Sequence, residues 1–510
     1  MFVRRKKNKS GSVTVQIVDK SNGYRIVQVI GTAREQTKID YFVENARHII
    51  RTSGGKQTEL FTYQMPEEIA IRRFLGQLSN EQVRVVGPEL VFGRLFDRLG
   101  FGSIAEDLFR HIVVARLAYP VSKVKTVDYL YRYQGVTTEI SSIYRFLDKL
   151  RNTYKEAVER LAFEYSKSVL GNISVVFYDM TTLYFESEDE DDLRKIGFSK
   201  DGKFQHPQIM LGLFVGEHGY PIGYDIFEGN VFEGHTLLPT LTKIRDKYGL
   251  GKPVVVADAA LLSRANLKAL TEEGYSFIIS ARIKNESVEI QQSILAQSRQ
   301  MKDQHGFEIE KADGTRLIVT YSDQRCKKDA YARERGLTKL RQKIKSGLLT
   351  NEHINNRGYN KFLTLTGNVM VSIDEEKVKA DHPWDGLKGY ITNTALPLDK
   401  IVENYRQLWQ IEKAFRISKT DLRIRPVYHY RRKRIEAHIC IAFVAYTIYK
   451  ELERLLNKYH AGFSPKRAAE LTHTMYALNY QSPNSYKQER FILKMDAAQQ
   501  VLYDIIKREE

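Results

Sequence analysis

Cysteine and tryptophan are scarce in this 510-residue chain, which has two of each. Because Cys326 and Cys440 lie far apart, they argue against a disulfide-stabilised secreted scaffold and fit a reducing cytosol. No cluster of Cys and His has the spacing of a structural zinc site. Apolar runs of about 20 residues are also absent, so we expect no membrane-spanning helix. The basic N-terminus lacks the apolar segment of a secretory signal, and we therefore expect a cytoplasmic protein.

Positive charge, in contrast, is in surplus. Lys and Arg number 79 and Asp and Glu number 62, which gives a formal net charge of +17. A large protein with this surplus usually meets a polyanion, because neutralised phosphates release counterions. Hydrophobic residues make up 42% of the chain, enough for packed cores. RNA-binding proteins show the same balance, so the charge predicts a nucleic-acid partner without selecting DNA.

The hydrophobic pattern changes along the chain. Residues 12–31 alternate as two β runs around Asn22-Gly23, which predicts a hairpin. From about 65 to 168, apolar residues recur at helical spacing. From residue 173 onward, the pattern predicts strands at 173–178, 208–215, 220–227, 254–257 and 275–281, with helices at 235–248 and 263–273. This order predicts a mixed sheet flanked by helices.

Two aspartates follow predicted strands of this sheet. Asp179 comes after residues 173–178, and Asp258 comes after residues 254–257. Both strands are continuous apolar runs, typical of strands buried on both faces. Because ligands bind outside the carboxyl ends of such strands, we expect both carboxylates at one rim, where they would suit Mg²⁺. Taken singly, each aspartate is more simply a turn residue or a helix N-cap.

Residues 398–419 predict one long helix that carries a third carboxylate. Tyr405, Glu412 and Lys419 are seven residues apart and would lie on nearly one line, with Arg416 one turn after Glu412. The adjoining apolar stripe would dock on the sheet; it consists of Ile401, Leu408, Ile411 and Phe415. Alone, this pattern would fit an ordinary amphipathic helix with surface ion pairs. Beside the two aspartates, it fits a metal ligand next to a phosphate backbone.

The segments around these carboxylates resemble DDE transposases of bacterial-type insertion sequences. Residues 178–182 (YDMTT) resemble the first-aspartate segment, and residues 256–263 (VADAALLS) resemble the second. Residues 405–419 are similar to the signature of the subgroup named for its Tyr, Arg, Glu and Lys. Leu408 stands where that subgroup has its Arg, and Ala260 stands where a glycine is usual. Further matching segments are 197–201 (GFSKD), 227–230 (FEGN), 392–394 (TNT) and 425–429 (RPVYH).

The resemblance implies an α/β fold: an RNase H-like catalytic core, a mixed sheet flanked by helices, with a β-rich insertion, a helical N-terminal DNA-binding region and a helical C-terminal tail. The separation of Asp258 and Glu412 is too long for one loop, which agrees with an insertion. We expect these divisions: a β-hairpin region (1–58), a helical DNA-binding domain (59–168), the first part of the core (169–285), the insertion subdomain (286–395), the second part of the core with the Glu helix (396–456) and the helical tail (457–510).

The function implied by the resemblance is DNA transposition through metal-dependent strand cleavage and strand transfer. Asp179, Asp258 and Glu412 would be the catalytic residues and the ligands of two Mg²⁺ ions, with Mn²⁺ as a substitute. The expected DNA-binding residues are Tyr405, Arg406, Arg416 and Lys419. The expected partners are double-stranded DNA, as terminal inverted repeats and target, and a second copy of the chain in a synaptic homodimer at the nucleoid. A different RNase H-fold nuclease, such as a resolvase, and a non-catalytic DNA-binding relative are the alternatives.

Three further patterns need a structure to interpret. Residues 126–150 contain two helical runs around Gln134-Gly135-Val136, as in a helix-turn-helix, although a plain α-hairpin explains them equally well. The exposed face of the second helix would present Ser141, Ser142, Arg145 and Lys149. The acidic run 186–192 suits a solvated loop better than a metal site. For Trp409, core packing is favoured over stacking on a base.

Overall fold

The computed structural model describes residues 1–52, 66–200, 202–258, 263–349, 353–355, 358–366, 370–481 and 487–509. Ala259 to Leu262 of the second-aspartate segment, and Asp201, lie outside these ranges. The chain forms two compact units, residues 1–78 and 79–510. Within the described ranges, no helix combines the length and the apolar character needed to cross a membrane.

The first unit is a three-stranded antiparallel sheet with a helix on one face. Its elements are β1 (Phe2–Lys7), β2 (Val13–Asp19), β3 (Arg25–Ala33), α1 (Gln36–Thr52) and α2 (Pro66–Gly76). The hairpin predicted around Asn22-Gly23 is formed by β2 and β3, and Gly23 adopts a φ of 95° at its turn. Val15 and Ile17 of the sheet pack against α1. The sequence pattern did not predict β1, because its charged side chains leave no apolar alternation to detect.

The second unit begins with helices that surround one long buried helix. The surrounding helices are α3 (Arg94–Arg98), α4 (Asp107–Ala118), α5 (Lys123–Tyr129), α6 (Ile140–Lys149) and α7 (Lys155–Leu170). The central helix is α15 (Arg432–Lys458), which is apolar on nearly every side from Ile435 to Leu456 and is therefore buried. A helical turn, Leu130–Gln134, extends α5, and Gly135 ends it with a φ of 71° before α6 begins.

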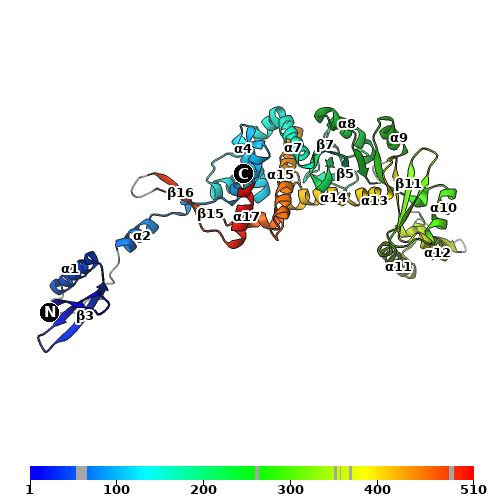
Figure 1. The fold of residues 1–510 in the computed structure, drawn as a ribbon. Coiled ribbons are helices and arrows are strands. Elements are labelled where there is room, and N and C mark those ends of the chain that lie inside the picture. The colour runs from blue at the N-terminus through cyan, green and yellow to red at the C-terminus, as the bar shows by residue number, and fades with distance from the viewer. Residues whose placement is uncertain are drawn as a thin grey trace. The chain divides into compact units, whose positions relative to one another are not determined.

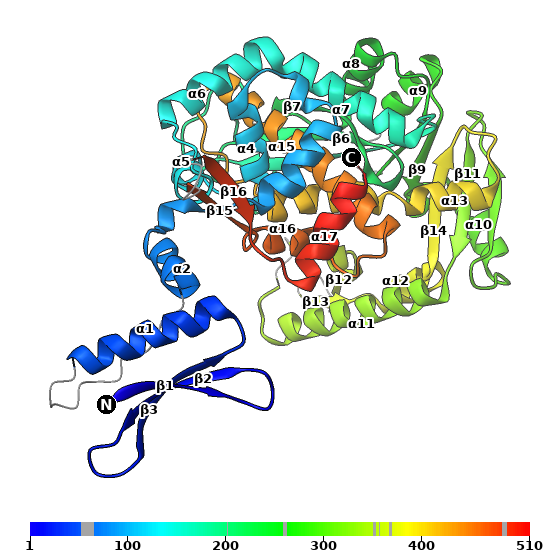
Figure 2. The ribbon, with the colours of Figure 1, turned by 60° about the vertical axis from the view of Figure 1, so that its left-hand side comes forward.

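A mixed eight-stranded sheet lies beside these helices, in the order β10-β11-β14-β9-β8-β5-β6-β7 (Figures 1 and 2). The strands that come first along the chain are β5 (Val175–Tyr184), β6 (Gln208–Val215), β7 (Pro221–Glu228), β8 (Val254–Ala257) and β9 (Phe277–Ala281). The pairs β5–β8 and β8–β9 are parallel, whereas β5–β6 and β6–β7 are antiparallel. The predicted mixed sheet flanked by helices is thus confirmed.

Helices cover both faces of this sheet, as Figure 1 shows. On one face, Val176, Tyr178 and Met180 pack against α8 (Leu237–Tyr248) and α9 (Arg264–Glu272). On the other face, Val175 and Phe177 pack in the cluster that contains α13 (Leu398–Arg406), α14 (Trp409–Arg416) and α15. Because side chains of a strand alternate between the faces, odd-numbered residues of β5 point towards α13, α14 and α15.

Residues 286–395 extend the same sheet and also contribute helices. Strands β10 (Gly306–Glu310), β11 (Arg316–Tyr321) and β14 (Leu387–Thr392) continue it beyond β9, while β12 (Leu363–Thr366) pairs with β13 (Met370–Ile373). The helices of the segment are α10 (Val288–Ser298), α11 (Asp323–Lys345) and α12 (Glu375–Asp381). The segment is therefore mixed, and its strands are continuous with those that carry the aspartates.

The C-terminal segment contains two strands as well as helices. Its elements are α16 (Pro465–Thr472), β15 (Tyr476–Gln481), β16 (Gln488–Ile492) and α17 (Ala497–Arg508). Strand β15 pairs with β4 (Val83–Val85), so the end of the chain is joined to the start of the second unit.

The prediction of a single long helix over residues 398–419 is wrong. It divides into α13 and α14, because the amides of Gln407 and Leu408 donate to carbonyls only three residues back, those of Asn404 and Tyr405. This tighter turn rotates α14 relative to α13. The apolar stripe nevertheless reaches the core: Ile401, Leu408, Ile411 and Phe415 are all buried.

We expect Ile411→Ala to lower the free energy of unfolding by about 2–5 kcal/mol, because it removes a fully buried side chain between α14 and the sheet. Denaturant unfolding of the full chain would measure this. The matched control, Glu403→Ala on the exposed side of α13, should change it by no more than about 1 kcal/mol. Equal effects of the two changes would contradict docking of α14 through Ile411.

Candidate active site

Two aspartates lie side by side on adjacent parallel strands. In the register of β5 and β8, Tyr178 stands opposite Ala257, and Asp179 and Asp258 are the next residues. By strand alternation, both lie on the face that packs against α13, α14 and α15. The prediction that Asp179 ends its strand is wrong, because β5 continues to Tyr184 through antiparallel pairing with β6. Asp179 instead marks the point where the parallel pairing ends.

The environment of Asp179 attracts cations. Burial raises the pKa of its carboxyl to about 6; Lys200 opposes the shift, and the negative charges of Glu233 and Asp258 add to it. Lys200 Nζ lies 3.7 Å from Asp179 Oδ1 and 2.9 Å from Glu233 Oε1. The same ammonium donates to the carbonyl of Met180 at 2.7 Å. The ammonium of Lys200 therefore partly neutralises the negative charges of Asp179 and Glu233.

Glu412 projects from α14 as an exposed side chain. The charges of Glu412 and Asp258 both shift the pKa of Lys388 on β14 and of Tyr405 on α13. Burial lowers the pKa of Lys388, Arg325 and Arg406 lower it further, and Asp258 and Glu412 raise it. Burial also raises the pKa of Tyr405 to about 12, and the same two carboxylates add to that shift. Asp258 and Glu412 thus act on one Lys388–Tyr405 pair, in which the ammonium lies 4.3 Å from the ring centroid.

The carboxylates fit a divalent cation by their chemistry. Oxygen donors are the ligands that Mg²⁺ prefers, and a bound cation would favour the charged form of Asp179, whose pKa burial raises. Within the described ranges, however, no three His, Cys, Asp or Glu side chains are close enough together to hold a metal ion. Asp179 and Asp258 are neighbours on the sheet, and Glu412 lies on α14 without joining them in such a cluster.

The four predicted DNA-binding residues differ in exposure. Arg406 and Arg416 are exposed, and Lys419 is half-buried in the helical turn Ile417–Asp421. Tyr405 is only 7% exposed and packs against Tyr390, with ring centroids 4.8 Å apart. Little of Tyr405 can therefore contact DNA directly. Leu408, where the family signature has Arg, belongs to the buried stripe.

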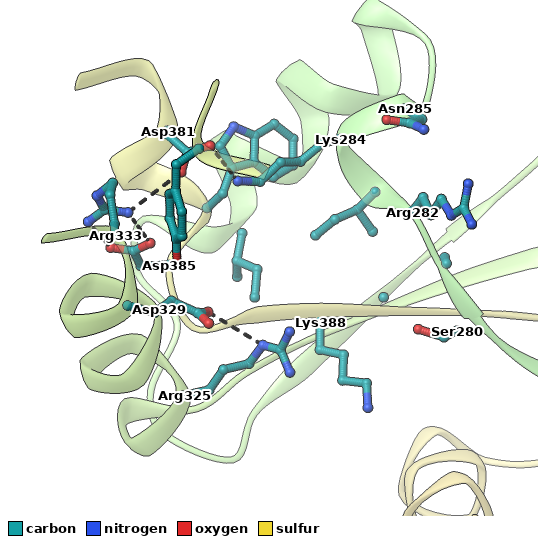
Figure 3. A pocket seen from close by; sticks show the side chains of 17 residues that line it. Ser280, Arg282, Lys284, Asn285, Arg325, Asp329, Arg333, Asp381, Asp385 and Lys388 are labelled. Carbon is teal, nitrogen blue, oxygen red and sulfur yellow. Dashed lines mark hydrogen bonds and ion pairs between the residues drawn. The ribbon is translucent and has the colours of Figure 1, made fainter. Parts of the chain in front are cut away.

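Two basic hollows adjoin Lys388. The first, of about 440 Å³, contains Arg282, Lys284, Arg325 and Arg333 among its lining (Figure 3). Its aspartates are already paired: Asp385 with Arg333, Asp381 with Lys284 and Asp329 with Arg325, as the dashed lines in Figure 3 show. The second hollow, of about 660 Å³, shares Arg325 and Lys388 and adds Arg406 and Trp409. The hollows together surround Lys388 with cations.

Trp409 is 50% exposed, so the prediction that it packs in the core is wrong. The tight turn between α13 and α14 places Leu408 in the core and leaves the neighbouring indole at the rim of the second hollow. Its ring lines the hollow together with Arg406, and Lys413 Nζ lies 5.5 Å from the ring centroid, an arrangement that can hold a nucleobase or a phosphate.

Three residues near the carboxylates were not predicted: Lys200, Glu233 and Lys388. Lys200 lies within the matching segment 197–201, which was a signal for its importance but not for its position. Glu233 and Lys388 carry no signal in the sequence, because each reaches the site through pairing or packing with elements distant in the chain.

A family model described as "Transposase DDE domain" matches residues 171–448. A comparison with curated proteins gives no match. Among solved structures, this chain is similar to a piggyBac transposase synaptic complex with hairpin DNA, at 10% identity and a TM-score of 0.38, over 76% of each chain. It is also similar to a Mos1 transposase paired-end complex with left transposon end, at 10% identity and a TM-score of 0.16, over 48% of this chain and 68% of that one.

The region matched by the family model is more than half of the chain, and it contains Asp179, Asp258 and Glu412. The chain therefore belongs to the transposase DDE domain family, and its function is DNA transposition.

Proposed function

We propose that this transposase cleaves and rejoins DNA with Asp179, Asp258 and Glu412 as the ligands of two divalent cations, Mg²⁺ or Mn²⁺. The observation that supports this assignment best is the placement of both aspartates on one face of the sheet, at neighbouring positions of β5 and β8. The helix that carries Glu412 packs on that same face. When bound, such cations lower the pKa of an attacking water or 3′-hydroxyl and stabilise the leaving oxygen.

Residues around the carboxylates would prepare the site for DNA. Lys200 keeps Asp179 ionised before cations bind and has a second carboxylate, Glu233, to receive its ammonium when it is displaced. Lys388 holds a non-bridging oxygen of the scissile phosphate, because its ammonium already lies in the field of Asp258 and Glu412. The ring of Tyr405 stabilises the ammonium of Lys388 through a cation–π contact.

Other residues would bind the DNA away from the cleaved bond. Arg406, Arg416 and Lys419 contact the phosphate backbone, and Trp409 stacks on a base. The elements α5 and α6 form a helix-turn-helix that reads the terminal inverted repeats; its Arg145 is exposed. Two copies of the chain join two ends in a synaptic homodimer. In this assignment, strands β7-β6-β5-β8-β9 are the RNase H-like core, and residues 286–395 are an insertion that extends it.

We expect Asp179→Asn to reduce Mg²⁺-dependent cleavage by at least ~100-fold, since even partners of metal ligands cost 10–100-fold when they are changed. The assay uses a labelled duplex that carries the inverted repeat flanking the gene. Asp189→Asn, the same chemical change in the exposed acidic run, is the control and should cleave normally. Binding of the duplex should be unchanged in both variants. Near-normal cleavage by Asp179→Asn would exclude a role for this carboxylate.

The raised pKa of Asp179 predicts a pH-dependent stability difference in chelator. The pKa in the folded chain, about 6, lies above the usual aspartate value of about 3.9, so the stability that the protonated carboxyl contributes is fully present only below about pH 4 and is lost as the pH rises through 6. Asp179→Asn stays neutral at every pH. The two proteins should therefore have the same melting temperature near pH 4. Towards pH 7, Asp179→Asn should melt at an increasingly higher temperature, because its free energy of unfolding exceeds that of the wild type by up to roughly 3 kcal/mol. A constant difference across this range would contradict the burial of an ionisable carboxyl.

For Lys388, we expect Lys388→Met to lower the slope of log affinity for duplex DNA against log salt by about 0.9, the contribution of one phosphate contact. Fluorescence anisotropy at several salt concentrations would measure the slope. Lys400→Met is the control, because Lys400 is exposed and already pairs with Glu403 at 2.8 Å. An unchanged slope in Lys388→Met would show that its ammonium does not contact a phosphate.

A further inference from the structure

A third hollow, of about 640 Å³, is lined by several basic residues. It lies between α5 and α6 on one side and residues 423–429 and α15 on the other. Five of its lining residues are basic: Arg116, Lys123, Lys125, Arg423 and Arg425. Among the described residues, no Asp or Glu lines it. The described lining of this cavity therefore carries basic side chains and no acidic ones.

Two of these cations are deeply buried without a carboxylate partner. Lys123 is 6% exposed, and its ammonium has no hydrogen-bond partner among the described residues. Arg116 is also 6% exposed; among the described residues, the hydrogen bonds of its guanidinium go to the carbonyls of Leu422 and Arg423, at 3.3 Å each. Burial lowers the pKa of Lys123 well below its usual range, with Arg116 adding to the shift, so holding an unpaired ammonium there is costly. Such a cost is tolerated where a ligand supplies the missing charge.

The same positive charges lower the pKa values of the two histidines that line the hollow. Burial lowers the pKa of His429 to about 3, and Lys123 and Arg116 lower it further. Burial lowers the pKa of His438 as well, with the same two cations adding to the shift. Asp148 raises the pKa of His429 but is itself paired with Arg434 at 2.9 Å, so it does not neutralise the hollow.

We propose that this hollow binds a phosphate group of the DNA backbone, through Lys123 and Arg116 at its floor and Lys125 and Arg423 at its exposed mouth. Its position favours DNA as the source of the phosphate, because α5 borders the hollow and is the first helix of the helix-turn-helix. In that motif the first helix crosses the sugar–phosphate backbone while the second enters the major groove. Tyr428 also lines the hollow, and its side chain is 60% exposed, so a DNA strand outside the hollow could contact it. The choice of DNA rests on the proposed function; the anion site itself does not.

The first test is thermal unfolding of the full chain in chelator, with inorganic phosphate as the probe against chloride of equal ionic strength. Phosphate should raise the melting temperature of the wild type. Lys123→Met should not respond to phosphate, and it should melt no lower than the wild type in chloride, because it removes a buried amine that has no hydrogen-bond partner among the described residues. Lys167→Met, an exposed lysine of α7, is the control and should respond as the wild type does. If Lys123→Met does not fold, Lys125→Met at the mouth should respond less to phosphate than the wild type.

The second test is anisotropy with duplex DNA over a range of salt, again without divalent cations. Lys123→Met should lose about 0.9 from the salt slope, and Lys167→Met should not. No phosphate response in the wild type, or an undiminished response in Lys123→Met and Lys125→Met, would overturn the anion site. A normal phosphate response combined with an unchanged salt slope in Lys123→Met would overturn DNA as its ligand and assign the hollow to free phosphate. Neither assay depends on cleavage, so failure of the carboxylate assignment would leave these results unaffected.

Discussion

Strands β5 and β8 pair in parallel with Tyr178 opposite Ala257, and every feature of the candidate active site depends on that register. The residues that follow are both aspartates, so one pairing brings two carboxylates from distant parts of the chain to neighbouring positions. A slip of one residue in either strand would turn one carboxylate to the face covered by α8 and α9. Glu412 can approach the other face only because Ile411 and Phe415 hold α14 against it.

The electrostatics of the molecule show two opposite imbalances. At the end of the β5–β8 pairing, burial raises the pKa of Asp179, with Glu233 and Asp258 adding to the shift and Lys200 opposing it, to about 6. In the hollow beside α5, cations are buried without carboxylates, and their field adds to burial in lowering the pKa of two histidines. The first imbalance suits a divalent cation and the second suits a phosphate. A transposase needs both, because it must hold DNA and act on one of its phosphodiester bonds.

Lys388 links the two halves of the active site. It extends from β14, a strand within residues 286–395, yet its ammonium lies over Tyr405 and in the field of Asp258 and Glu412. The strands of this segment are therefore part of the wall of the site and not a separate attachment. Their continuity with β9 fixes the distance between the basic hollows and the carboxylates, which a flexibly linked subdomain would not do.

The sequence by itself determined the mixed sheet and the identity of the family, and it singled out the three carboxylates, because apolar periodicity and short motifs are local properties of the chain. It also determined that Ile401, Leu408, Ile411 and Phe415 form one buried stripe. Only the tertiary structure decided that the helix of residues 398–419 is broken, that Trp409 is exposed and Tyr405 buried, and that Lys200, Glu233 and Lys388 surround the carboxylates. These features depend on strand register, on one tightened helical turn and on contacts between residues far apart in the chain, and none of those leaves a periodic signal in the sequence.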